Sequence, residues 1–247
     1  MSSKNIILLL GHENSYYKII RELIGKQENG SNYYQVTINE IEYDLYVTFG
    51  QSKSINPFSL IQSIECISNN LKEAENIYAF GICGSCNGEK FPKQHIVFPS
   101  QFGILSKQEL IENSENPMNS ATKLTNELVQ ELQKTEHVIP FGNQFIQLAS
   151  SISNSTPNTR NLTVPGILTN QHSLNGIDEE HRNMFLEIND TVEMECYQIV
   201  NICKQYKINL GVYLQVSDIL IKEDFSFSEE DQEIFKNNFF TIMNQIK

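Results

Sequence analysis

The sequence predicts an α/β fold built on a buried central sheet, and two stretches carry this prediction. Residues 5–10 are predicted to form a strand whose apolar run, residues 6–10, ends at Gly11, and a helical pattern follows over 16–24. A strand, a glycine turn and a helix are the usual opening of a parallel α/β fold. Residues 210–216 (LGVYLQV) form a second, nearly continuous apolar run, which is typical of a strand covered on both faces.

Length and composition indicate one ordinary globular unit. The 247 residues fit a single α/β domain, so we expect residues 1–247 to fold together. Hydrophobic content of 40% and charged content of 19% are normal for a globular protein. The formal net charge of −12 argues against a nucleic-acid partner, which needs a basic surface.

The cysteines and the apolar runs bear on the compartment. The chain shows no signal-peptide pattern, and no apolar run reaches the length of a membrane span. The cysteine count is odd and lacks the spacing of a disulfide framework, which favours reduced thiols. We therefore expect a cytoplasmic protein with no membrane partner and no metal. The cysteines are Cys66, Cys83, Cys86, Cys196 and Cys203.

The other elements follow from local patterns. In the first half we expect strands over 33–38 and 41–49 joined at Asn39-Glu40, a helix over 54–70, strands over 77–83 and 95–99, and a surface excursion over 103–120. In the second half we expect a helix over 124–133, a strand over 138–148, a loop over 150–161, a broken strand over 162–169, a helix over 179–187 and a terminal helix over 228–247.

Residues 191–220 are the most informative stretch for function. A helix that starts near Glu193 is predicted to lead into the strand 210–216, which stops at Ser217-Asp218. Ligands sit at the carboxyl ends of strands in open α/β sheets, and a carboxylate there is costly unless something uses it. Glu195 lies near the helix start, where the helix dipole favours negative charge. Alone each acid is ordinary, but one helix and strand could bring both to one end of a sheet.

These residues carry a family resemblance. The segment VEMECYQIVNIC followed by QVSDIL resembles the C-terminal signature of the nucleoside phosphorylase family, which includes purine nucleoside phosphorylases, uridine phosphorylases and methylthioadenosine/S-adenosylhomocysteine nucleosidases. Gly81-Ile82-Cys83-Gly84 resembles the family's glycine turn, and the turn after Gly11 matches its opening turn. The resemblance implies a three-layer α/β/α fold whose mixed central sheet is partly barrel-like.

The resemblance also implies which residues form the site. Glu195 would accept hydrogen bonds from ribose hydroxyls, and Asp218 would act as the acid toward the purine. Glu13 is the nearest acidic residue for activating water in the first turn. The implied substrate-binding residues are Met194 against the sugar, Glu195, Ser217 beside the purine, and the glycines Gly81, Gly84 and Gly11.

The implied reaction is cleavage of the N-glycosidic bond of a purine nucleoside, in a homo-oligomer without a cofactor. Inorganic phosphate could serve as a co-substrate. However, Ala79 and Ile82 stand where phosphorylases carry Arg and Ser, and residues 11–15 contain no Arg. Because a phosphate dianion binds weakly without cations, this favours water as the nucleophile. In nucleosidases the residue that activates this water aligns with Tyr16 rather than Glu13, so the nucleophile stays open.

Two other functions remain as alternatives. The chain could be a nucleoside-binding relative with weak or no turnover, because the half of the site that handles the nucleophile departs from the family. Less expected is a thiol-redox protein, since Cys83 and Cys86 form a CxxC motif after a strand. The flanking Trp of such motifs is missing, and the resemblance to a glycine turn accounts for the same residues.

Overall fold

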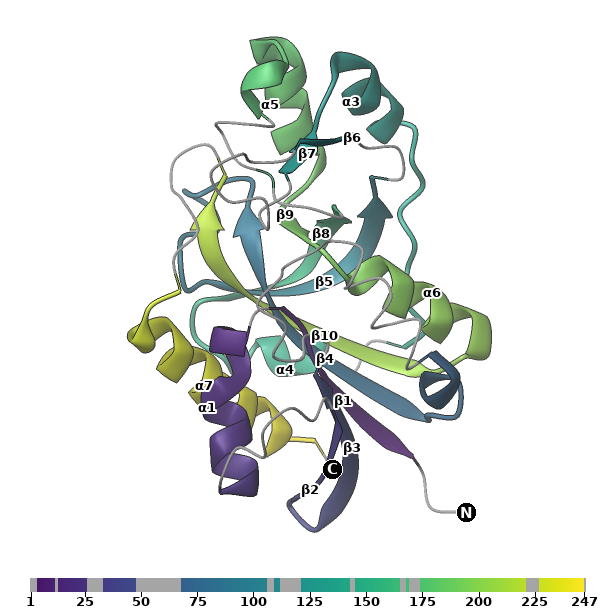
Figure 1. The fold of residues 1–247 in the computed structure, drawn as a ribbon, viewed down its shortest axis with the longest axis vertical. Coiled ribbons are helices and arrows are strands. Elements are labelled where there is room, and N and C mark those ends of the chain that lie inside the picture. The colour runs from purple at the N-terminus through teal and green to yellow at the C-terminus, as the bar shows by residue number, and fades with distance from the viewer. Residues whose placement is uncertain are drawn as a thin grey trace.

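The computed structural model describes residues 4–11, 13–25, 33–47, 68–105, 109–111, 121–142, 145–164, 168, 174–220 and 227–246. Its centre is an eight-stranded mixed sheet with helices on both sides (Figure 1). The predicted three-layer α/β class is therefore confirmed. The described helices are α1 (Glu13–Ile24), α3 (Asn126–Leu132), α4 (Ile146–Ala149), the 3-10 helix η1 (Leu174–Gly176), α5 (Glu179–Ile188), α6 (Cys196–Tyr206) and α7 (Glu229–Met243).

Five of the strands close into a barrel. They are β4 (Asn76–Ser85), β5 (Ile96–Ile104), β8 (Ser155–Thr163), β9 (Thr191–Glu193) and β10 (Asn209–Ile219). Strand β10 runs parallel to β4 on one side and antiparallel to β5 on the other. Strand β8 pairs with β5 and β9, and β9 pairs with β4, so the ring returns to its starting strand. This closure gives the central sheet the barrel-like character that the family resemblance implied.

The remaining strands extend the sheet away from the barrel. Strand β1 (Asn5–Leu9) runs parallel between β4 and β3 (Ile41–Val47), and β3 forms a hairpin with β2 (Tyr33–Ile38). The hairpin turns at Asn39 and Glu40, whose φ angles are 51° and 67°, as the sequence predicted. A separate two-stranded sheet pairs β6 (Glu109–Ile111) with β7 (Ala121–Lys123).

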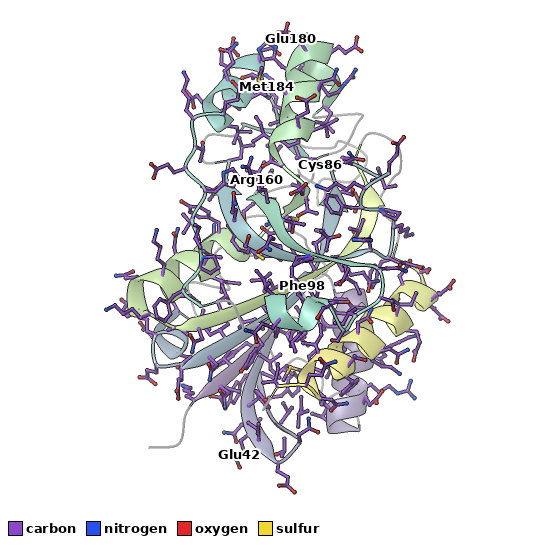
Figure 2. All side chains as sticks on the ribbon, turned by 180° about the vertical axis from the view of Figure 1, so that it is seen from behind. Glu42, Cys86, Phe98, Arg160, Glu180 and Met184 are labelled. Carbon is purple, nitrogen blue, oxygen red and sulfur yellow. The ribbon has the colours of Figure 1, made fainter. Side chains whose placement is uncertain are left out.

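The central strands are buried on both faces because their side chains alternate between two cores. Ile6 and Leu8 of β1 belong to the core that includes Ile199 and Val200 of α6. Ile7 of β1, by contrast, belongs to the core under α1 and α7. A third core packs α3 and α5 over one end of the barrel (Figure 1). Figure 2 shows the same cap from behind, with Met184 on α5 and Cys86 below it.

Most of strand β8, residues 155–161, was wrongly predicted as a loop, and its polar composition explains why. Residues 155–163 read STPNTRNLT, which lacks the apolar alternation of an ordinary strand. In the structure Asn161 and Thr163 are buried, and both donate hydrogen bonds to the Glu193 carboxylate. Polar side chains therefore fill positions that apolar ones usually occupy, and a neighbouring strand satisfies them.

The predicted strand over 138–148 is also wrong. Only Val138 makes an isolated bridge, to Phe102, and residues 146–149 form the short helix α4. Phe145 starts this helix and is buried against Gly211 of β10, where a Cβ would come within 2.8 Å of the ring. The apolar residues of this stretch therefore serve core packing and not strand pairing.

Two boundaries near the predicted site also differ from expectation. Residues 191–193 form β9, and α6 starts only at Cys196, so Glu193 lies in a strand and not in a helix. Strand β4 continues through Gly84 and Ser85, so the expected glycine turn is extended backbone. Residues 68–71 end the predicted helix over 54–70, and residues 54–67 lie outside the described part of the chain.

Candidate active site

The turn between β9 and α6 holds the Glu195 side chain in a buried position, 5% exposed. The Gly11 N–H at the end of β1 and the Met194 backbone hydrogen-bond its carboxyl group. Burial, followed by the nearby charge of Glu193, raises the pKa of Glu195 well above its ordinary value. The buried Glu195 carboxyl group therefore links the turn before α6 to the end of β1.

Glu193 shapes this turn, and sequence reasoning missed its role. Its carboxylate accepts hydrogen bonds from the backbone N–H groups of Glu195 (2.5 Å) and Cys196 (2.7 Å). Its other oxygen accepts from Asn161 Nδ2 (2.8 Å) and from the Thr163 hydroxyl. The side chain therefore caps the start of α6 from the preceding strand, as N-terminal capping requires. The run of alternate polar residues in 159–163 was the one sequence signal for it.

Asp218 lies near the end of β10, beside an irregularity in the strand. The pairing of β10 with β4 shifts between Val216 and Asp218, which places Asp218 opposite Gly84. The Ser217 hydroxyl is buried 2.6 Å from Asp218 Oδ1 and 3.2 Å from the Cys83 carbonyl oxygen. Asp218 itself is half-buried. The Ser-Asp pair is thus held against the end of β4.

The two acids come to the same end of the sheet. Strand β4 runs parallel to both β1 and β10, so the carboxyl ends of all three strands share one edge. Burial, and then the charges of Asp218 and Glu193, raise the pKa of the Cys83 thiol near the end of β4. Gly11, Glu195 and Asp218 therefore lie toward the same edge of the sheet, the edge at which α/β folds bind ligands.

The three predicted glycines differ in their surroundings. A Cβ at Gly81 would come 3.1 Å from side-chain atoms of Leu10 and Leu214, so packing explains that glycine. A Cβ at Gly84 would come 3.2 Å from Asp218 Oδ2. Gly11 has a φ of 101°, which disfavours other residues. Substrate binding by these glycines stays a prediction.

Some predicted residues are only partly described. Glu13 is the first residue of α1, so it lies in the helix and not in the expected turn over 11–15, and its side chain lies outside the described part. Met194 is half-buried in the turn before α6. Residues 12, 48–50, 165–167 and 169–173, together with 221–226 after β10, also lie outside it.

A cavity of about 360 Å³ lies close to this edge but is a different place. Its lining comes from the segment after β4 and from α5 with the residues that follow: Cys86, Asn87, Lys90, Asn183, Leu186, Glu187, Asn189 and Asp190. Burial is the largest cause that raises the pKa of the Cys86 thiol, and the nearby charges of Asp190 and Asp218 raise it further. Cys86 lines this cavity, whereas Ser217 and Asp218 do not.

The electrostatics of the site disfavour thiolate chemistry. Cys83 and Cys86 are free and buried, and burial raises the pKa of both thiols, whereas redox cysteines have low pKa values.

Among the described residues, no His, Cys, Asp and Glu side chains form a group of three that could hold a metal ion. Within the same residues, neither Glu193 nor Glu195 takes part in an ion pair. No described helix is long and apolar enough to cross a membrane.

Comparisons with known proteins agree with this geometry. The family model described as the phosphorylase superfamily matches residues 54–246. A methylthioadenosine/S-adenosylhomocysteine nucleosidase from Campylobacter jejuni has a similar structure, with a TM-score of 0.62, 15% identity and 98% of each chain covered. No curated protein matches the chain in sequence.

Two further solved structures share the fold. A purine nucleoside phosphorylase from Toxoplasma gondii has a TM-score of 0.63 at 15% identity, covering 97% of this chain and 88% of its own. A futalosine hydrolase mutant from Helicobacter pylori has a TM-score of 0.59 at 11% identity, covering 98% of this chain and 96% of its own. At such low identity these likenesses establish the fold, and the residues must supply the argument for function.

Proposed function

The chain belongs to the phosphorylase superfamily, and on that premise we propose that it cleaves the N-glycosidic bond of a purine nucleoside and releases the free base. The observations that carry the proposal are the place of Asp218 near the end of β10, opposite Gly84 of β4, and the place of Glu195 beside Gly11 after β1, because the carboxyl ends of these parallel strands share one edge of the sheet. The structurally similar proteins include nucleosidases and a purine nucleoside phosphorylase, which supports this substrate class.

The proposed roles follow from the position of each acid. Glu195 hydrogen-bonds the ribose hydroxyls, with Met194 against the sugar, while positive charge develops at the anomeric carbon. Asp218 protonates or hydrogen-bonds the purine at N7, and Ser217 holds the Asp218 carboxyl in place through their 2.6 Å contact. The backbone beside Gly11, Gly81 and Gly84 borders the ligand. Glu13 is our candidate for activating water in the first turn.

Water is the favoured nucleophile in this proposal. The side chains of Ala79 and Ile82 on β4 are neither charged nor hydroxylated, so they offer no partner to an incoming anion at these two positions. Inorganic phosphate would need cationic or multiple hydrogen-bonding partners, as phosphate sites in proteins provide. Phosphate remains a possible co-substrate, and its effect on the rate decides between the two.

Three further proposals concern the domain organisation, the oligomeric state and the cellular location of the protein. We propose that residues 1–247 act as one domain, because β1 near the start of the chain and β10 near its end flank the same strand β4. We also propose a homo-oligomer, since family members complete their pockets with neighbouring subunits, and a cytoplasmic location, since the described thiols are unpaired.

The test is chromatography of purine nucleosides incubated with the protein, with and without phosphate. Free base in both conditions supports hydrolysis, and free base only with phosphate overturns the preference for water. Glu195→Gln and Asp218→Asn should each reduce turnover at least tenfold, whereas Glu187→Gln, an exposed acid on α5, should not. A thermal shift with nucleosides but no free base would favour the binding-only alternative. Indifference to both acidic substitutions would reject the site.

A further inference from the structure

The cavity beside α5 is crossed by an ion pair. It has a volume of about 360 Å³ and lies between the segment after β4, where Cys86 sits below α5 (Figure 2), and the end of α5 itself. Lys90 Nζ lies 3.0 Å from Asp190 Oδ1, so the pair joins these two walls. The Lys90 side chain is 57% exposed and that of Asp190 is 24% exposed. The two charges therefore stand where the cavity opens to solvent, within reach of a ligand.

The acidic member of this pair is held by the backbone around it. Asp190 Oδ2 accepts from the Arg160 N–H at 2.9 Å, and the Asp190 N–H donates to the Arg160 carbonyl oxygen at 3.0 Å. The Asp190 carbonyl oxygen accepts from the Cys86 N–H, also at 3.0 Å. The carboxylate is therefore fixed, whereas the long, exposed Lys90 side chain can leave the pair at little cost, because exposed ion pairs contribute little to stability.

Asn189, which also lines the cavity, has an acceptor without a donor. It is 3% exposed, and its Nδ2 donates to the Phe185 carbonyl oxygen at 3.2 Å, which identifies Oδ1 as the acceptor. Within the described part of the chain this Oδ1 accepts no hydrogen bond. Burial lowers the pKa of the neighbouring His137, and Asn189 partly offsets this, yet the buried His137 Nε2 makes no hydrogen bond either. A buried acceptor is costly unless a donor from outside the chain meets it.

We propose that this cavity binds a zwitterionic amino acid. The ligand's carboxylate pairs with Lys90, and its ammonium group pairs with Asp190 and donates to Asn189 Oδ1. A ligand with a single charge would take one member of the ion pair and leave the other without a counter-charge, whereas a zwitterion placed between them gives each a new partner. Ligand cavities measure about 300–1,000 Å³, so this one, at about 360 Å³, suits a molecule of amino-acid size.

The rest of the lining indicates which amino acids fit. Leu186 of α5 and the buried Cys86 offer an apolar surface in the same cavity, so a ligand with an apolar side chain fits better than one with a further charge. Ser217 and Asp218 do not line this cavity. The site is therefore separate from the proposed nucleoside site, and the inference does not depend on the proposed function.

The first test is calorimetric titration of the full chain with L-leucine, L-alanine and glycine. L-leucine should bind most tightly, because only its side chain covers the apolar lining. Leucinamide, which lacks the carboxylate, and N-acetyl-L-leucine, which lacks the ammonium group, should each bind at least about tenfold more weakly than L-leucine, since each loses a charged partner. The absence of binding by all three amino acids, or equal binding of either single-charge analogue, overturns the inference.

The second test uses variants of the ion pair. Lys90→Gln and Asp190→Asn should each weaken L-leucine binding at least about tenfold, whereas Lys204→Gln, at an exposed lysine of α6, is the matched control and should not. Thermal unfolding without ligand checks that Lys90→Gln still folds. A lower stability of Lys90→Gln with unchanged binding would make the pair a structural tie and overturn the inference. Loss of binding in Asp218→Asn would do the same, by moving the ligand to the other site. Leucine binding without nucleoside turnover would reject the proposed function alone.

Discussion

Gly84 of β4 lies directly opposite Asp218 of β10, and a methyl group added at Gly84 would come 3.2 Å from Asp218 Oδ2. The same methyl group would lie 3.3 Å from Leu220 Cδ2, so the carboxylate has little room to retreat. The side chain that we propose as the acid thus lies where a methyl group at Gly84 would crowd it, and a substitution of this glycine can be used to displace it.

We expect Gly84→Ala to reduce nucleoside turnover about tenfold, because small displacements of a reacting group are costly. The effect on turnover should be larger than the effect on the stability of the fold, since a shift of only a few tenths of an ångström relieves the strained contact. Steady-state kinetics and thermal unfolding measure the two effects. Gly176→Ala is the matched control, because its Cβ would meet only an ordinary contact at 3.7 Å. Equal activity of the two variants would remove Asp218 from the reaction.

Ser217→Ala tests whether the hydroxyl beside Asp218 orients it. The Ser217 hydroxyl is buried and reaches both Asp218 Oδ1 and the Cys83 carbonyl oxygen. Its removal should lower the free energy of unfolding by about 1 kcal/mol, the usual contribution of one hydrogen bond. Turnover should fall further than this loss explains, and Ser217→Thr should recover part of it. Unchanged turnover in Ser217→Ala would mean that the hydroxyl serves only strand packing.

The thiols provide a prediction that separates the nucleoside site from a redox site. Cys83, Cys86, Cys196 and Cys203 are free and buried, and burial raises the pKa of each, that of Cys203 to about 12. In a Cys66→Ser background, a thiol reagent at pH 8 should label the native protein slowly and the denatured protein at once. Rapid labelling at the CxxC motif, or its oxidation to a disulfide with altered activity, would restore the redox alternative.

Asp231 in the first turn of α7 predicts a pH dependence of stability. Its carboxylate accepts from the Ser228 N–H and hydroxyl, both at 2.7 Å, and from Gln94 Nε2 at 2.8 Å, and it pairs with Lys93. Burial alone would raise the pKa of Asp231, but the hydrogen bonds from Gln94 and Ser228 and the charge of Lys93 bring it below its ordinary value. The stabilisation is therefore present above the unfolded-state pKa and is lost as pH falls through the folded one.

Asp231→Asn should lower the free energy of unfolding by about 1–3 kcal/mol at pH 7, because the amide cannot accept all these hydrogen bonds. The difference from the unaltered protein should shrink as the pH falls below 3.8, the ordinary value for this group. Denaturant unfolding at several pH values measures it. Glu230→Gln, an exposed neighbour in the same turn, should show a much smaller difference. A difference that stays constant with pH would contradict the assignment.

The parts of the fold that could be predicted are those in which local pattern and burial agree. Strands β1, β4 and β10 are apolar on both faces, and such runs are distinctive. The helix α7 was predicted from Ser228, which forms a capping box with Asp231. Strand β8 could not be recognised, because its buried Asn161 and Thr163 are satisfied only by an acid far along the chain.

The candidate site divides in the same way. Glu195 and Asp218 could be named from the sequence because they stand in a motif that links a helix start to a strand end. No role could be predicted for Glu193, since its hydrogen bonds to Asn161 and Thr163 cross from one strand to another. A role that depends on strand pairing over about thirty residues leaves little trace in local spacing.

The closure of the barrel has a consequence for biosynthesis. Strand β10 fills the place between β4 and β5, and its residues are translated long after both neighbours. Until it emerges from the ribosome, the facing edges of those two strands have no partner in the ring, and unpaired edges invite association with other chains. A nascent chain stalled before residue 209 should therefore depend on chaperones, and release of the next dozen residues should end that dependence.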